Sequence, residues 1–413
     1  MVTREGAHLA ANVPKYYIYQ AALNLQFWMS VSILYLRWRG LSLGEIGLLE
    51  TVGGLVIMLS EIPTGAIADL MGRRWSISMG MFLSVVGLIL YGLADSFWLV
   101  ALSYVPWMIG YTMTSGADSA LLYDSLKAVG REDQYAKLEG RAVAVANGAG
   151  AVAGITGALV ATKWGLATPI WVTAAVTFLG GLVALSFQEP PRQRTSATAR
   201  GSLLNQFRSA AVVLTEQRIL FSLMLFGALT TGVSFILKQS YFQVYAQAAG
   251  LPISFMGVLS FTLVGAGMIG ASLSGSLVAR LGEQRTLLIV PCLMGLAFLG
   301  MTATRSLPGL AFLLVVPFLS SALSPALKAA INRGVTSEVR ATVLSTQSLL
   351  WALVLSVLSP LVGFIADRSI PLAFFALAAA LLCSALVLWS LTSRYGQRAA
   401  SAVTQGDSPN LPS

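Results

Sequence analysis

Carboxylates inside long apolar stretches are the side chains of this sequence best suited to chemistry. Asp118 lies in SGADSALLYDSLKAVG, and Glu61 begins EIPTGAIADLMGRR at residues 61–74. At about 1.5 Å of helix per residue, Asp118 lies about 13 Å from Lys127, and Glu61 lies about 12 Å from Asp69. A charge at that depth is costly and marks a functional site by default. Both carboxyls are therefore candidates to carry a proton; the alternative for each is a structural carboxyl satisfied by hydrogen bonds.

A denser group of charges closes the same apolar run. Asp69, Arg73 and Arg74 lie there, with Gly65 and Gly72 among them. A glycine such as Gly65 lets two membrane helices approach closely, and Gly72 permits a tight turn. The carboxylate can meet the positive amino-terminal end of another helix, and the arginines can bind carboxylates or anionic lipid headgroups. These contacts would hold neighbouring segments together at the membrane edge; we call this charged group the gate, and a plain basic loop is the alternative.

Partners for this gate lie elsewhere in the chain. Asp124 lies about one helical turn from the membrane edge, within reach of Arg141 and of the two arginines of the group. The helix that would receive Asp69 starts in TSEVRATVLS, where Thr336 or Ser337 can act as its cap. We therefore expect the gate to join three or more segments of the chain.

Lys238 is a basic residue within an expected span, about 12 Å from its outer end. It either extends its aliphatic stem to the interface or faces a cavity, where it would bind a carboxylate or an anionic substrate. Polar and aromatic residues recur at helical spacing beside it and in two other spans. This pattern favours a substrate cavity, with packing or interface anchoring as the alternative. The candidate lining residues are Asn24, Phe27, Trp28, Lys238, Gln239, Phe242, Gln243, Gln347 and Trp351.

Membrane helices are needed to position these residues. Hydrophobic residues make up 56% of the 413 residues and charged residues 10%, whereas soluble domains carry about 25% charged residues. Apolar runs of about 18 residues or more, long enough to span a bilayer, recur along the whole chain. We therefore predict an all-α membrane protein with twelve spans, at 15–37, 43–69, 74–94, 97–126, 134–161, 167–187, 217–246, 252–279, 285–304, 308–330, 338–365 and 370–392.

The basic residues orient these spans. With both termini in the cytoplasm, 20 of the 26 Lys and Arg residues lie on the cytoplasmic side and five lie outside. Membrane proteins carry their excess of basic residues in cytoplasmic loops. Both termini are therefore expected in the cytoplasm, with the chain in the cell membrane. The net charge of +9 is then a topology signal, and nucleic acid is not an expected partner.

A polar segment divides the spans six and six. Residues 188–216 begin QEPPRQRTSATARGS, a composition typical of a linker. We expect six-helix bundles at 1–187 and 217–395, and a disordered cytoplasmic tail at 396–413.

The second half carries a weakened copy of the charged group. GSLVARLGEQR at 275–285 repeats the glycine spacing of the first copy at an offset of 210 residues. Ala279 replaces the aspartate there, and Glu283 replaces the first arginine. We therefore expect an asymmetric gate.

The run GAIADLMGRR resembles the cytoplasmic loop signature of the major facilitator superfamily, G-x-x-x-D-x-x-G-R-[RK], and every specified position matches. With twelve spans, a central linker and a second copy, the resemblance covers nearly the whole chain. It implies two pseudo-symmetric six-helix bundles that rock about a site near the midplane, with a latch at this loop that forms when the cytoplasmic side closes. Two departures from the family's proton-coupled drug exporters leave that subclass without support. Thr112 stands where they carry an arginine, and Ile155 and Ala158 interrupt their glycine-proline motif.

Several other classes lack the residues that they need. The single histidine, His8, lies in the amino-terminal tail, and Cys292 and Cys383 lie within apolar spans. Neither a metal centre nor a disulfide framework is expected from them. The sequence has no phosphate-binding loop and no nucleophile–base pair, which disfavours ATP-driven pumps and hydrolytic enzymes. We expect no cofactor, and a monomer.

The sequence thus predicts a secondary transporter that works by alternating access. The first hypothesis is proton-coupled export of an amphipathic compound. The second is proton-coupled uptake of a metabolite or vitamin, which Lys238 would hold if it is anionic. A transport-dead sensor on the same fold is a third, although an intact gate and buried carboxylates argue against it. The expected partners are a small-molecule substrate, protons and the lipid bilayer.

Overall fold

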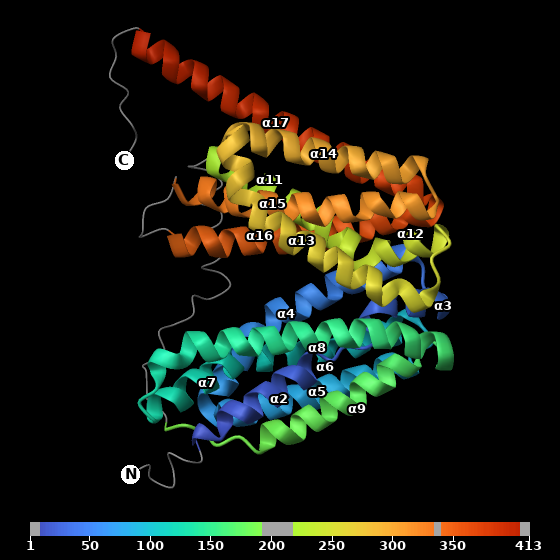
Figure 1. Cartoon of the computed structure of the whole chain (residues 1–413), viewed down its shortest axis with the longest axis vertical. Helices are drawn as coiled ribbons and strands as arrows, with labels where there is room; N and C mark the ends of the chain where they lie inside the picture. Colours follow the sequence, from blue (N-terminus) through green and yellow to red (C-terminus); the bar gives the residue numbers. More distant parts are fainter. Residues whose placement is uncertain (1–8, 192–217, 334–339, 405–413) are drawn as a thin grey trace. The chain divides into compact units, whose positions relative to one another are not determined.

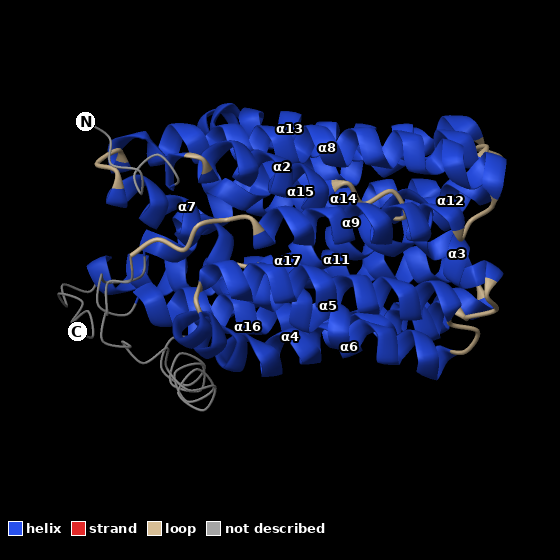
Figure 2. Ribbon diagram, turned by 90° about the horizontal axis from the view of Figure 1, so that it is seen from below, coloured by secondary structure: helices blue, strands red, loops and turns tan. Residues whose placement is uncertain are grey.

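The computed structural model describes residues 9–191, 218–333 and 340–404, and every regular element in these ranges is a helix (Figure 1). Figure 2 shows the same helices joined by short loops. Ten helical segments of the described residues are long and apolar enough to cross a membrane. Their helices are α4 (Leu43–Met71), α5 (Arg73–Leu93), α8 (Tyr135–Trp164), α9 (Thr168–Leu185), α11 (Arg218–Ile236) with α12 (Phe242–Ala248), α13 (Met256–Leu281), α14 (Glu283–Ala303), α15 (Leu310–Arg333), α16 (Arg340–Arg368) and α17 (Ile370–Thr404). The all-α membrane fold is confirmed.

The first and fourth expected spans are broken helices rather than continuous ones. Their pieces are α2 (Asn12–Asn24), a short 3₁₀ turn (Met29–Val31), α3 (Ser32–Trp38), α6 (Phe97–Thr114) and α7 (Ala117–Ala128). The fourth span breaks at Gly116, whose φ of 79° is left-handed. Glycine adopts this conformation without a steric penalty. The break gives α7 an amino-terminal end of its own inside the expected span.

The seventh span contains a wide turn. Between α11 and α12, residues Leu237–Tyr241 form a π-helix. Such turns are rare and occur frequently at functional sites. Lys238 and Gln239 lie on this turn.

Two helix boundaries show how the sequence sets the ends of α4. Ser42 caps its start: the Ser42 hydroxyl accepts the Glu45 backbone N–H at 3.1 Å, and the Glu45 carboxylate accepts the Ser42 N–H at 2.8 Å. Such reciprocal pairs satisfy amide groups that the first turn of a helix leaves open. At the other end, Gly72 has a φ of 103°. It alone separates α4 from α5.

The chain forms two compact units, which are described separately. The first contains α2 to α9, together with Gln243–Phe261 and Ser359–Phe364, and the second contains most of α11 to α17. In the first unit, α5 packs against α6 and α9; in the second, α14 packs against α15 and α17. By position in the chain these are equivalent spans. The two units therefore repeat one packing pattern.

The core of the first unit lies where α2, α5, α7 and α9 meet. Buried side chains there include Tyr16, Tyr19, Met81, Leu121 and Phe187. A second close contact lies between α8 and the break in the first span, where a Cβ added to Gly157 would collide with the carbonyl of Phe27. The glycine thus allows backbone-to-backbone approach, as small residues do between membrane helices.

The last helix is longer than its expected span. α17 continues to Thr404, past Gly396, where the sequence predicted the start of a disordered tail. The expected linker at 188–216 lies mostly outside the described residues, as do Thr336 and Ser337.

Candidate functional site

A polar network in the first unit surrounds Asp118. Tyr16 and Gln20 lie one turn apart on α2, and Gln20 Nε2 donates to an Asp118 carboxylate oxygen at 2.9 Å and to the Tyr16 hydroxyl at 3.0 Å. The Tyr16 hydroxyl in turn donates to the Glu139 carboxylate on α8 at 3.2 Å. One hydrogen-bonded path thus joins two carboxylates on two helices through side chains of a third.

The helix break at Gly116 places Asp118 in the first turn of α7. The other carboxylate oxygen of Asp118 accepts the Ser119 backbone N–H at 2.7 Å. A carboxylate is favoured at a helix amino-terminus because the open amide groups there carry positive partial charge. Each oxygen therefore has an N–H donor, and the carboxylate is held in a defined orientation.

The charged group after α4 lies at one end of the first unit, which we call the motif end. Arg73 there forms an ion pair with Asp124 at 2.9 Å, and each side chain is 31% exposed. The guanidinium of Arg74 lies over the Trp75 ring at 5.3 Å. Of the partners proposed for Asp124, the structure thus selects Arg73. The pair joins the start of α5 to α7.

A carboxylate that sequence reasoning missed caps α5. Glu189 accepts the backbone N–H of Arg73 at 2.8 Å and that of Arg74 at 2.9 Å. Gln188 next to it exchanges two hydrogen bonds with the side chain of Asn12, at 2.8 and 2.9 Å. The chain after α9 is therefore fastened to the motif end. An acidic residue directly after an apolar span was the available signal.

Glu139 was missed as well. It lies in KLEGR at 137–141, where it was read only as part of the start of a span. Its own spacing carries little information, because its partner Tyr16 is more than a hundred residues away. A carboxylate beside the amino-terminal end of an expected span was the only hint.

Other predicted residues of the gate and of proton coupling have exposed side chains. Glu61 and Asp69 are exposed on α4, and Arg141 is exposed on α8. Gly65 is half-buried. The roles predicted for these residues stay predictions.

The second copy of the charged group carries an ion pair of opposite polarity. Glu283, which replaces the first arginine, pairs with Arg333 at the end of α15. In the first unit the cation lies at the start of α5 and the carboxylate on α7; in the second the carboxylate lies at the start of α14. Both pairs join equivalent spans. The two copies of the charged group thus differ in which of the two joined spans carries the cation and which carries the carboxylate.

The candidate lining residues lie in different surroundings. Trp28 is 3% exposed and packs against Tyr91 and Trp107, with ring centroids 5.1 and 5.0 Å apart. Phe242 is buried, whereas Lys238 is exposed on its π-helical turn. Five others are half-buried, namely Asn24, Phe27, Gln239, Gln347 and Trp351. Residues that helical spacing grouped thus differ in burial, and their role as a cavity lining stays a prediction.

Gln243 is fully buried and fastens the broken first span from within the first unit. Its side-chain oxygen accepts the backbone N–H groups of Ile33 and Leu34 at 3.0 and 3.3 Å. Its Nε2 donates to the Met29 carbonyl at 3.0 Å and to the Ser32 hydroxyl at 3.3 Å. Helix α3 begins at Ser32 after Val31, which has no side-chain cap. Gln243 therefore supplies the cap that the local sequence lacks.

No group of three or more His, Cys, Asp or Glu side chains suited to a metal ion is found in the described ranges.

A comparison with protein-family models identifies one family for this chain. A model described as the Major Facilitator Superfamily matches residues 17–356. Among curated proteins, none matches the sequence.

Solved structures show the same fold. The nucleoside transporter NupG has 12% sequence identity and a TM-score of 0.72, over 94% of this chain and 99% of that one. A bacterial homologue of the human lysosomal transporter Spinster, inward-facing and unoccupied, has 16% identity and a TM-score of 0.64 over the whole of both chains. A bacterial homologue of the iron transporter ferroportin, also inward-facing, has 14% identity and a TM-score of 0.69, over 94% of this chain and 99% of that one.

Proposed function

Because the chain belongs to the major facilitator superfamily, we propose that it exports a small amphipathic solute in exchange for protons, by alternating access. The family consists of membrane transporters, and the ten apolar segments of the described residues make the chain a multi-pass membrane protein. We propose further that it works as a monomer in the cell membrane. The motif end and both termini would then face the cytoplasm, as the basic residues indicate.

The observation that carries proton coupling is the Asp118 network. As a carboxylate, Asp118 accepts N–H groups on both oxygens, from Gln20 and from Ser119. A protonated carboxyl has an O–H to donate and accepts hydrogen bonds less readily on that oxygen. When the proton binds the oxygen that faces Gln20, a turn of the Gln20 amide offers its carbonyl oxygen to the O–H and withdraws its N–H from Tyr16. Protonation of Asp118 on α7 thereby changes the hydrogen bonds of Gln20 and Tyr16 on α2.

Glu139 extends this response to α8. When the Gln20 N–H turns away, the Tyr16 hydroxyl oxygen no longer accepts a hydrogen bond from it. The Tyr16 O–H still donates to the Glu139 carboxylate. The three helices α2, α7 and α8 thus share one polar network whose arrangement depends on a proton. A proton that changes the packing of helices is what coupled alternating access requires. Glu61, exposed on α4, is the second candidate carrier.

Reconstituted liposomes that contain a pH-sensitive dye test this function. Amphipathic cations, organic anions and neutral metabolites would be added in turn, and the class that elicits proton movement identifies the substrate class. We expect Asp118→Asn to abolish that movement, whereas Asp95→Asn, at an exposed loop position, leaves it at the wild-type rate. Glu139→Gln should reduce it. Proton-coupled flux that persists unchanged in Asp118→Asn and Glu61→Gln would refute the assignment of the carriers.

One observation favours uptake of an anion as the second candidate function. Lys238 is exposed on a π-helical turn, a geometry that recurs at functional sites. If the substrate is anionic, Lys238→Gln should lose transport of organic anions, while Lys238→Arg keeps it. Equal transport by both variants would leave export as the better proposal. A sensor without transport would give no flux with any class.

A further inference from the structure

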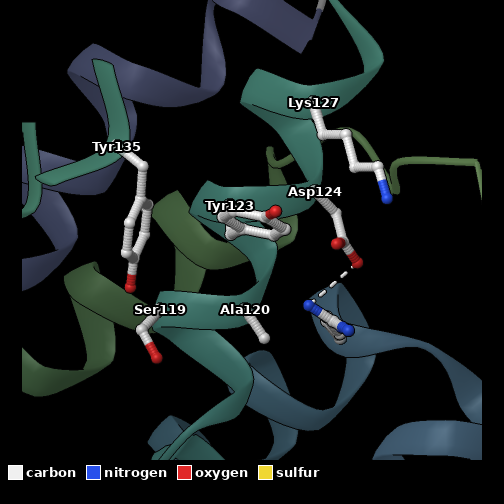
Figure 3. Close-up of a pocket in the computed structure, with 7 residues that line it drawn as sticks. Ser119, Ala120, Tyr123, Asp124, Lys127 and Tyr135 are labelled. Carbon is white, nitrogen blue, oxygen red and sulfur yellow. Dashed lines mark ion pairs between the residues drawn. The ribbon is translucent and has the colours of Figure 1, made fainter. Parts of the chain in front are cut away.

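A pocket of about 420 Å³ opens at the motif end of the first unit (Figure 3). Figure 3 shows Tyr135 and Ser119 on one side of it, Tyr123 in the middle, and Asp124 and Lys127 on the other side. The pocket is lined by Arg73, Ser119, Ala120, Tyr123, Asp124, Lys127 and Tyr135. At roughly 30 Å³ per water molecule, it has room for several waters among polar partners.

The pocket is next to the Asp118 network. Ser119, which lines it, holds Asp118 through its backbone N–H at 2.7 Å. The Tyr135 hydroxyl pairs with the Ser119 side chain and lies within electrostatic range of both Asp118 and Glu139. The pocket lining thus includes two hydroxyl-bearing residues, one that holds Asp118 through its backbone and one within electrostatic range of both carboxylates.

Several titratable or charged groups face this region from the packed helices. They are Tyr16 and Tyr19 on α2, Arg73 on α5, Asp118 and Asp124 on α7, and Tyr135 and Glu139 on α8. Arg73 is held by Asp124 on the far side of the pocket. Glu132 and Asp133 are exposed just before Tyr135 and can attract protons to the opening.

We propose that this pocket is the route by which protons pass between solvent and the Asp118–Glu139 network, with the Tyr135 and Ser119 hydroxyls as the last carriers. The proposal rests on the proton coupling proposed above. A protonated water (hydronium) in the pocket gives its extra proton to the hydroxyl oxygen and is left as water, while the hydroxyl releases its own proton to the next oxygen. Neither hydroxyl gains a net charge, and the proton ends on a carboxylate.

The chain offers a matched pair of tyrosines for the test. Tyr123 and Tyr135 line the same pocket and pack edge to face, with ring centroids 5.3 Å apart. Tyr135 lies within electrostatic range of Asp118 and Glu139 and pairs with Ser119, so its hydroxyl is the one that the proposal uses. Tyr135→Phe and Tyr123→Phe each remove one hydroxyl and keep the ring.

Proton uptake can be measured without a substrate. Full-length protein in lipid nanodiscs, in weakly buffered solution, would be subjected to a rapid drop in pH while an indicator dye reports uptake. We expect Asp118→Asn to lose part of the uptake amplitude. Tyr135→Phe should keep the amplitude but slow that phase about tenfold or more, as loss of a proton-transfer group does, and Ser119→Ala should slow it as well. Tyr123→Phe should match the wild type.

The outcomes separate this inference from the proposed function. An unchanged amplitude in Asp118→Asn would refute Asp118 as a carrier and with it the proposed coupling. Loss of amplitude in Asp118→Asn, combined with wild-type rates in Tyr135→Phe and Ser119→Ala, would overturn the route alone. Equal slowing in both tyrosine variants would also overturn it, because the hydroxyl of Tyr135 would then have no special part. Thermal unfolding of each variant confirms that it is folded.

Discussion

Replacement of Gln243 by leucine tests how the broken first span is held. The substitution keeps a side chain of similar size but removes the amide. The backbone N–H groups of Ile33 and Leu34 and the carbonyl of Met29 would then lose their contacts with Gln243. The first amide groups of a helix have no acceptor inside it, so the helix itself cannot replace the lost contacts of α3.

The size of the effect follows from these contacts. Loss of an N-cap costs about 0.5–2 kcal/mol, and each buried backbone group left unpaired costs about 1–3 kcal/mol. Partial relaxation reduces the total, and we take about 3 kcal/mol for local opening at the start of α3. At about 1.4 kcal/mol per factor of ten, this corresponds to roughly 100-fold.

Hydrogen exchange followed by mass spectrometry measures this opening on peptides that cover residues 29–38. We expect the amides of Ile33 and Leu34 to exchange roughly 100-fold faster in Gln243→Leu. Gln243→Glu keeps an acceptor for both amides and should leave their exchange close to that of the wild type. Gln239→Leu removes the same amide one turn away as a control. Exchange that is unchanged in Gln243→Leu, or changed equally in Gln239→Leu, would show that Gln243 does not cap α3.

The remaining predictions concern the motif end and its counterpart. The ion pairs Arg73–Asp124 and Glu283–Arg333 join equivalent spans with their charges exchanged. Each pair can be reversed by a double substitution, namely Arg73→Glu with Asp124→Arg, or Glu283→Arg with Arg333→Glu. The reversed pair should recover stability that the single variants lose. The coupling should be about 0.2–1 kcal/mol, as for partly exposed pairs; a double-mutant cycle of thermal unfolding that is strictly additive would argue against either pair. Glu189→Ala should uncap α5 at a cost of about 1 kcal/mol. Exchange of the Arg73 and Arg74 amides should then be roughly fivefold faster, with Glu189→Gln in between, and equal exchange in all three proteins would contradict the cap.

The break in the fourth span shows a limit of pattern reading. A continuous span at 97–126 was expected, since apolar character alone does not distinguish Gly116 from glycines that helices tolerate. In the structure its left-handed φ starts a new helix and places Asp118 at the amino-terminal end. Asp118 was singled out for its cost in an apolar stretch. Its partner Gln20, and Glu139 that joins the network through Tyr16, lie on helices whose packing the pattern does not contain.

Gln243 is a second residue whose contacts the sequence pattern does not predict. Helical spacing grouped it with other polar residues, but spacing does not show what packs against it. The buried amide meets the start of α3, more than two hundred residues earlier in the chain.

The all-α membrane fold and the family followed from the amino-acid sequence, and ten of the expected spans are long apolar helices among the described residues. They depend on hydropathy and on a short motif, and both are local properties of the chain because a helix satisfies its backbone hydrogen bonds within itself. The caps from Glu189 and Gln243, the polarity of the two ion pairs and the link between Asp118 and Glu139 came only from the tertiary structure. Each joins residues distant in sequence, and their meeting depends on how whole helices pack rather than on any nearby pattern.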